Sequence, residues 1–159
     1  MRLKTALSAI AVLLATFPMS GEGPTAVAII VNKASSVDTL SARDVKQIFS
    51  GVKKRWPDGQ RITTLGPGPD APEHAEAVQF FFGMSETEYR KYCIQATFTG
   101  NTDQVPKEYA SSQAAANLVQ VIPGAIAFVR ADVVSSNVKL VKIDNKAPGE
   151  PGYPLAGAK

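Results

Sequence analysis

Residues 25–32 read Thr-Ala-Val-Ala-Ile-Ile-Val-Asn, and this stretch decides the fold class. It is a continuous apolar run rich in β-branched residues, without the alternation of polar positions that marks a strand with one face in water. Such a run predicts a strand buried on both faces, as in a parallel or mixed sheet. Residues 125–129, Ala-Ile-Ala-Phe-Val, follow a Pro-Gly pair and predict a second buried strand.

Helix-start signals lie between and beside these two runs. Ser41 is a good N-cap with Asp44 three residues later, and Ser85 forms a capping box with Glu88. Together with the apolar spacing, these signals predict helices over residues 42–49, from 70 or 72 to 82, from 85 to about 98, and from 111 or 112 to about 121, with short strands over 62–65 and 138–143.

Alternation of strands and helices predicts the domain organisation. It favours one α/β domain over residues 24–145, a mixed sheet flanked by helices. The alternating strand over residues 138–143 is expected at an edge of that sheet. Residues 146–159 contain several prolines and glycines, and are expected to form a poorly ordered C-terminal tail.

The first residues resemble an export signal. Arg2 and Lys4 precede an apolar stretch over residues 6–17, and a segment rich in Pro, Ser and Gly follows. This pattern predicts a signal peptide over residues 1–22, cut between residues 20 and 23, and a periplasmic or secreted mature protein. The alternative is a buried N-terminal helix.

Composition excludes several classes of function. The chain has 159 residues, with one Cys and one His, which excludes an internal disulfide framework and a His-rich metal site. Removal of Arg2 and Lys4 leaves 15 of the 17 basic residues against 14 acidic ones, a net charge of +1, so nucleic-acid binding is not indicated. No motif points to a cofactor. The basic run at residues 53–55 is open to two interpretations, a solvated loop or a binding patch.

Four pieces of sequence together carry a family resemblance. They are residues 27–33, Leu40-Ser41 with residues 48–51 and Trp56, residues 98–100, and the Pro-Gly-Ala-Ile-Ala-Phe-Val segment over 123–129. In this order they resemble the phosphate-type periplasmic solute-binding proteins of ABC transporters, and among these the short, single-lobe members. The resemblance covers residues 26–134. It implies one lobe of a periplasmic-binding-protein-like fold, phosphate or another small oxyanion as ligand, and a membrane transporter as partner.

The family resemblance also points to a ligand loop. In the phosphate binders a Ser-Gly-Thr segment near an Arg donates to the anion at a helix N-terminus. The matching residues 65–74 contain three prolines and no Ser, Thr or Arg. His74 stands where short members often carry an Arg, and as a free imidazole it is charged mainly below pH ~6.5. The resemblance implies these candidate ligand-binding residues: Gly68, Asp70, Ala71, Glu73 and His74.

Two functions follow, and a third is disfavoured. The first is an exported solute-binding or accessory protein of phosphate uptake whose anion loop is unmatched. The alternative is an envelope protein-interaction module that binds a partner protein near the Phe-Phe-Phe run over residues 80–82. Consecutive helical positions lie ~100° apart and cannot share one core, so this run predicts either a helix buried on two sides or an apolar interaction patch. An enzyme using Cys93 and His74 is disfavoured, because Cys93 lies in the middle of a predicted helix with nothing to activate it.

Overall fold

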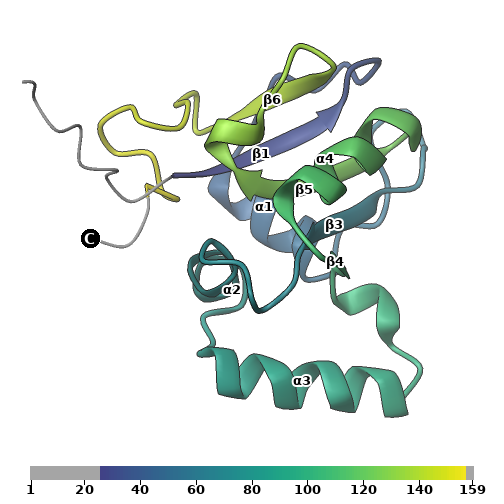
Figure 1. The fold of residues 1–159 in the computed structure, drawn as a ribbon. Coiled ribbons are helices and arrows are strands. Elements are labelled where there is room, and N and C mark those ends of the chain that lie inside the picture. Colours follow the sequence, from purple (N-terminus) through teal and green to yellow (C-terminus); the bar gives the residue numbers. More distant parts are fainter. Residues whose placement is uncertain (1–25, 157–159) are drawn as a thin grey trace, which may run out of the picture.

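The computed structural model describes residues 26–156, so the predicted signal peptide over residues 1–22 lies outside the described part. Within that part the chain forms a mixed sheet with helices around it (Figure 1). The strands are β1 (Val27–Asn32), β2 (Thr39–Leu40), β3 (Thr63–Pro67), β4 (Lys107–Tyr109), β5 (Ala125–Arg130) and β6 (Val138–Ile143). The helices are α1 (Ala42–Phe49), α2 (His74–Phe82), α3 (Glu86–Phe98) and α4 (Ser112–Val121), with short 3-10 turns η1 (Thr102–Gln104) and η2 (Ala131–Val133).

The sheet has the strand order β2-β6-β1-β5-β3-β4. Strand β1 is antiparallel to both β5 and β6, whereas β3 runs parallel to β5 and β4, and β2 runs parallel to β6. The α/β prediction with a mixed sheet is therefore confirmed. The predicted edge position of β6 is wrong, because the two residues of β2 pair with its outer side.

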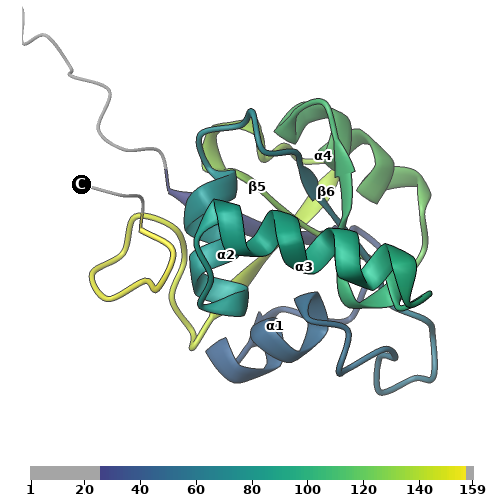
Figure 2. The same cartoon turned by 90° about the horizontal axis from the view of Figure 1, so that it is seen from below.

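Burial of β1 on both faces explains its unbroken apolar sequence. Val27, Ile29 and Val31 face a core that α1 and α2 cover, while Ala28 and Ile30 face a second core that α4 covers. Figure 2 shows α1 and α4 on opposite sides of the strands. We call the core beneath α1 and α2 the near-side core. The sheet is thus the middle of three layers, and α3 lies outside them, against α2 and η1.

The run over residues 80–82 belongs largely to the near-side core. Phe81 is buried and stacks on Phe49 of α1, with ring centroids 4.2 Å apart. Phe80 lies under the Lys46 ammonium, and Phe82 packs against Tyr89 of α3. Each of the three rings therefore has a partner within the chain, and the predicted interaction patch at these residues is not an exposed surface.

The C-terminal segment differs from its expected disorder over residues 146–156. Tyr153 and Leu155 are buried in the near-side core. The Val27 amide donates to the Leu155 carbonyl at 3.0 Å, and the Tyr153 hydroxyl donates to the Val27 carbonyl at 2.8 Å. Two apolar side chains and these hydrogen bonds hold the segment against the start of β1, although its prolines and glycines resemble those of a free tail.

Two of the sequence segments that carry the family resemblance contact each other in the fold. The Trp56 indole N–H donates to the Gly124 carbonyl at 3.0 Å in a buried position. Gly124 has a φ of +76°, which favours glycine, and an added Cβ would overlap the Arg61 carbonyl. The Trp and the Pro-Gly turn are therefore structural, and they fix how β3 and β5 begin side by side.

Candidate functional site

The predicted ligand loop lies where β3 ends and α2 begins, and α4 begins beside it (Figure 1). Backbone donors of this loop are partly used by the chain itself. The Gly68 amide donates to the Tyr109 carbonyl at 2.8 Å, the Ala71 amide to the Gly68 carbonyl at 3.0 Å, and the His74 amide to the Ala71 carbonyl at 3.0 Å. Three of the five candidate residues therefore have no free backbone N–H for an anion.

Glu73 occupies the N-cap position of α2 with its carboxyl group buried. One carboxyl oxygen accepts a short hydrogen bond from the Ser112 hydroxyl in the first turn of α4. That hydroxyl oxygen in turn accepts from the Arg130 amide at 2.9 Å. The second carboxyl oxygen is buried and has no hydrogen-bond partner within residues 26–156. The starts of α2 and α4 thus enclose an acidic group of the chain itself.

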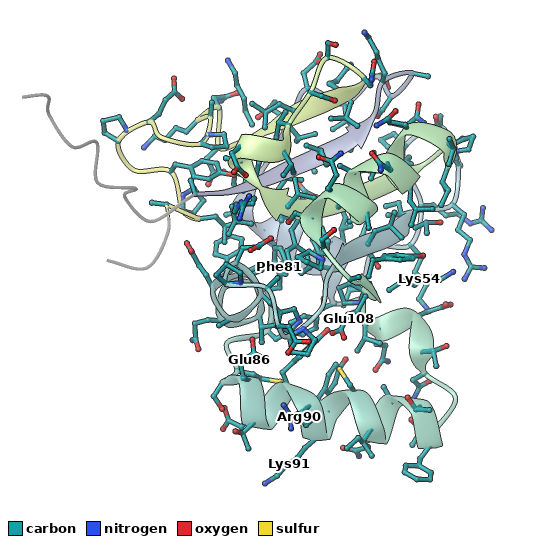
Figure 3. The ribbon with its side chains drawn as sticks, viewed as in Figure 1. Lys54, Phe81, Glu86, Arg90, Lys91 and Glu108 are labelled. Carbon is teal, nitrogen blue, oxygen red and sulfur yellow. The ribbon has the colours of Figure 1, made fainter. Side chains whose placement is uncertain are left out.

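His74 lies in the first turn of α2 with its side chain 1% exposed. Its Nδ1 lies 2.6 Å from a Glu86 carboxyl oxygen of α3, and its Nε2 lies 3.2 Å from a Glu108 carboxyl oxygen of β4. An ionised carboxylate only accepts hydrogen bonds, so when both glutamates are ionised both ring nitrogens donate, which is the imidazolium form of the ring. Figure 3 shows Glu86 and Glu108 reaching into the space between α3 and the sheet.

The pKa of His74 follows from the same contacts. Burial acts to lower the pKa, but the hydrogen bonds and charges of Glu108 and Glu86 together outweigh it. The pKa is therefore raised above its ordinary value of 6.5. The contacts therefore favour the charged form of His74, and in that form both ring N–H groups are bound to carboxylates.

The structure brings together only some of the candidate residues. Glu73 and His74 form one cluster with Glu86, Glu108 and Ser112, whereas Asp70 is exposed. Glu108 carries no sequence signal, because it lies 34 residues from His74 in a three-residue strand that shows no pattern. Glu86 lies between Ser85 and Glu88 of the capping box, and nothing in the sequence marks it as a partner of His74.

The electrostatic character of the cluster is acidic. Three carboxyl groups surround one imidazolium, and Asp70 adds a fourth nearby in sequence. A small anion that approached the start of α2 would meet like charges within a few ångströms, where charge–charge interactions are strong at the lower dielectric constant of a protein surface. Within residues 26–156, no group of three or more His, Cys, Asp or Glu side chains is arranged to hold a metal ion.

Cys93 lies on α3 and is half-buried. Burial raises the pKa of its thiol, which disfavours the thiolate that a nucleophile needs. Because both ring nitrogens of His74 bind glutamates, His74 has no lone pair to activate this thiol. Neither residue has the properties of an activated Cys–His pair.

Solved structures of phosphate transport proteins have a fold similar to that of this chain. An ABC-type phosphate transport receptor from Vibrio cholerae superposes with a TM-score of 0.62 and 18% identity, over 78% of this chain and 48% of that one. A phosphate ABC transporter substrate-binding protein from Clostridium perfringens, solved with bound phosphate, gives 0.60 and 18%, over 78% and 47%. The phosphate-binding protein from Stenotrophomonas maltophilia gives 0.54 and 19%, over 78% and 40%.

The chain therefore has a periplasmic-binding-protein-like fold, the fold of phosphate ABC transporter substrate-binding proteins. It spans about half the length of the structures it matches. The resemblance stated from the sequence is confirmed at the level of the fold. No protein-family model matches the chain, and no curated protein matches it by sequence. Across residues 26–156, every helix is too short or too polar to cross a membrane.

Proposed function

We propose that this protein is an exported, non-enzymatic solute-binding or accessory protein of the phosphate-transport type, and that the start of α2 is closed to phosphate by its own carboxylates. The fold supports the first part, since the neighbours in structure are transport solute-binding proteins. The observation that carries the second part is the His74 ring held between Glu86 and Glu108, with the Glu73 carboxyl buried beside it.

The physical reason for closure is competition for donors. A phosphate at a helix N-terminus needs free N–H groups and a cationic or hydroxyl neighbour. Here the Ser112 hydroxyl and both His74 ring N–H groups are bound to glutamates. An incoming phosphate would have to displace carboxylates that the fold holds in place.

The single histidine of the chain provides a direct test. We expect inorganic phosphate, titrated into the mature protein, to leave the imidazole C–H resonances of His74 unmoved in NMR spectra. The matched variant Glu108→Gln removes one competing carboxylate without changing its size. Saturable phosphate-dependent shifts of the His74 resonances in the unsubstituted protein, with tighter binding in Glu108→Gln, would show that the site is open and contradict the proposal.

A second function, docking on a partner protein, is favoured by one observation on α3. Ile94 and Phe98 lie four residues apart on this helix and are 52% and 88% exposed. Residues at this spacing share one helix face. The exposed apolar surface that the interaction hypothesis needs therefore lies on α3 and not at residues 80–82.

Cross-linking in the cell envelope tests this second function. A photoreactive residue at position 98 is expected to capture a discrete partner, and Ile94→Ser is expected to reduce the yield while leaving the unfolding midpoint unchanged. A photoreactive residue at exposed Lys142, on β6, is the matched control. Equal or absent capture at both positions would contradict docking through α3.

A further inference from the structure

A basic pocket lies at the opposite end of β3 from the start of α2. It has a volume of about 450 Å³ and forms between the loop after α1, the first residues of β3, η1 and the start of β4. Figure 3 shows Lys54 on this side of the molecule, to the right of Glu108. Its charged lining residues are Lys53, Lys54, Arg55, Arg61, Lys107 and Asp103.

The fold gathers cations here that are separated in sequence. The run over residues 53–55 supplies three of them, whereas Arg61 precedes β3 and Lys107 begins β4. The sequence alone left this run as either a solvated loop or a binding patch. Its meeting with Arg61 and Lys107 around one cavity favours the binding patch.

Acidic partners compensate only part of this charge. Asp103 is the one acidic residue that lines the pocket, and it accepts two hydrogen bonds of 3.0 Å from the Arg61 guanidinium. The Lys54 ammonium lies 3.9 Å from the same carboxylate. Lys53 pairs with Asp44 outside the pocket. Five cations therefore face two carboxylates, and Lys107 forms no ion pair or side-chain hydrogen bond within residues 26–156.

Backbone pairing brings two of the cations together. Arg55 and Arg61 lie opposite each other in an isolated antiparallel bridge. Like charges at directly opposed positions destabilise such a pair, and the Arg61 side chain is 67% exposed. The arrangement has an unrelieved excess of positive charge that a bound anion would neutralise.

The rest of the lining indicates the size and chemistry of the ligand. Thr63, Thr64 and Thr102 add hydroxyl groups, while Ile48 and Ile62 add apolar wall. The volume lies within the range of about 300–1,000 Å³ that is usual for small-molecule sites, and it is larger than a lone inorganic ion requires. Arginine forks and lysines are suited to phosphoryl oxygens, and the apolar wall is suited to a carbon body.

We propose that this pocket binds the phosphoryl groups of a small organic molecule, carried either by a free solute or by a lipid headgroup. The Arg61 fork and the Lys54 and Lys107 ammonium groups would contact the phosphoryl oxygens, and Arg61 would exchange its bonds to Asp103 for bonds to the ligand. The inference goes beyond the proposed function and does not depend on it, because no residue that lines the pocket belongs to the cluster at the start of α2.

Calorimetric titration of the mature protein tests the pocket. The probes are ADP, pyrophosphate and uncharged adenosine, at about 0.15 M ionic strength, where the Debye length is about 8 Å and remote charges are screened. We expect saturable binding of ADP and no binding of adenosine. Sedimentation with phosphatidylglycerol vesicles, against phosphatidylcholine vesicles, tests the lipid headgroup as the source.

Three variants test which residues bind the ligand. The double variant Lys54→Gln with Lys107→Gln is expected to weaken ligand binding about tenfold or more, since charge-assisted contacts are lost. Asp103→Asn removes the competing carboxylate and is expected to tighten it several-fold. The control pair Lys91→Gln and Lys142→Gln removes the same charge elsewhere and is expected to leave affinity unchanged.

The outcomes separate the inference from the proposed function. Binding of ADP or of phosphatidylglycerol that only the pocket variants change supports the inference and identifies the source. Absence of binding to ADP, pyrophosphate and vesicles overturns it, as does an equal loss in the control pair. Binding that shifts the His74 resonances, and that the pocket variants leave unchanged, contradicts the proposed function instead. Unchanged unfolding midpoints of the free variants confirm that each one folds.

Discussion

Replacement of His74 by glutamine should cost stability in a manner that depends on pH. The imidazolium donates to Glu86 and to Glu108 from a buried position, and a hydrogen bond to a charged group contributes about 1.5–3 kcal/mol. Glutamine can still donate to one carboxylate, so about one such bond is lost. The two glutamates are 35% and 36% exposed, and water can hydrate the released one. We therefore expect a loss at the low end, about 1.5–2 kcal/mol, below pH 6.5.

The sign of the pH dependence follows from the raised pKa of His74. The folded state binds this proton more tightly than the unfolded state, whose pKa is about 6.5. The stabilisation is fully present below pH 6.5 and is lost as the pH rises through the folded pKa, so the free energy of unfolding should fall with rising pH. Nearby Tyr89 and Cys93 have pKa values raised by burial, so both remain protonated across this window.

Two measurements check this reasoning. NMR titration of the only histidine should give a pKa above 6.5, and Glu86→Gln and Glu108→Gln should each lower it. Urea unfolding at pH 6 and pH 8.5 should show a smaller difference between His74→Gln and the unsubstituted protein at the higher pH. A His74 pKa at or below 6.5, or an equal stability loss at both pH values, would refute the charged triad of His74, Glu86 and Glu108.

Three further outcomes follow from buried positions. In Gly66→Ala the new Cβ would overlap the Phe128 ring, so urea unfolding should show that the free energy of unfolding falls by about 1–3 kcal/mol. Gly68→Ala is the control, and it should lower the free energy of unfolding much less because the nearest neighbour atom lies at 3.6 Å. Leu155→Ala should cost about 2–5 kcal/mol, and a loss near zero would contradict docking of the C-terminal segment. The Cys93 thiol, whose pKa burial raises, should react with a disulfide reagent more slowly in native buffer than in denaturant, and equal rates would contradict its burial.

Local patterns predicted most of the fold. The apolar run of β1 indicates two-sided burial because every position along it faces a core. The capping box of Ser85 and Glu88 is confirmed at the start of α3, and the helix predicted over residues 42–49 is confirmed as α1. These features depend on residues within one turn of each other. Strands β2 and β4 were not predicted, because elements of two and three residues form only through pairing with distant strands.

The site was less predictable than the fold. The family resemblance pointed to Glu73 and His74, and the structure places both in one cluster. Their partners could not be predicted, since Ser112 lies 39 residues from Glu73 and Glu108 lies 34 residues from His74. Whether the start of a helix is open to a ligand depends on such distant side chains. The same limit applies to the basic run at residues 53–55, whose companions Arg61 and Lys107 meet it only in the folded chain.

The two ends of β3 have opposite charge. At the start of α2 three carboxyl groups surround one imidazolium, whereas the basic pocket has five cations and one carboxylate in its lining. Lys107 of the pocket and Glu108 of the cluster are consecutive residues of β4, opposite Leu65 and Gly66 of β3, so the two sites adjoin at that point. Glu108→Gln and Lys107→Gln should therefore have effects on stability and on ligand affinity that are not additive. If both proposals hold, a small oxyanion is repelled at the end that the family resemblance predicted and attracted at the other end, and the chain keeps this fold with its anion site elsewhere.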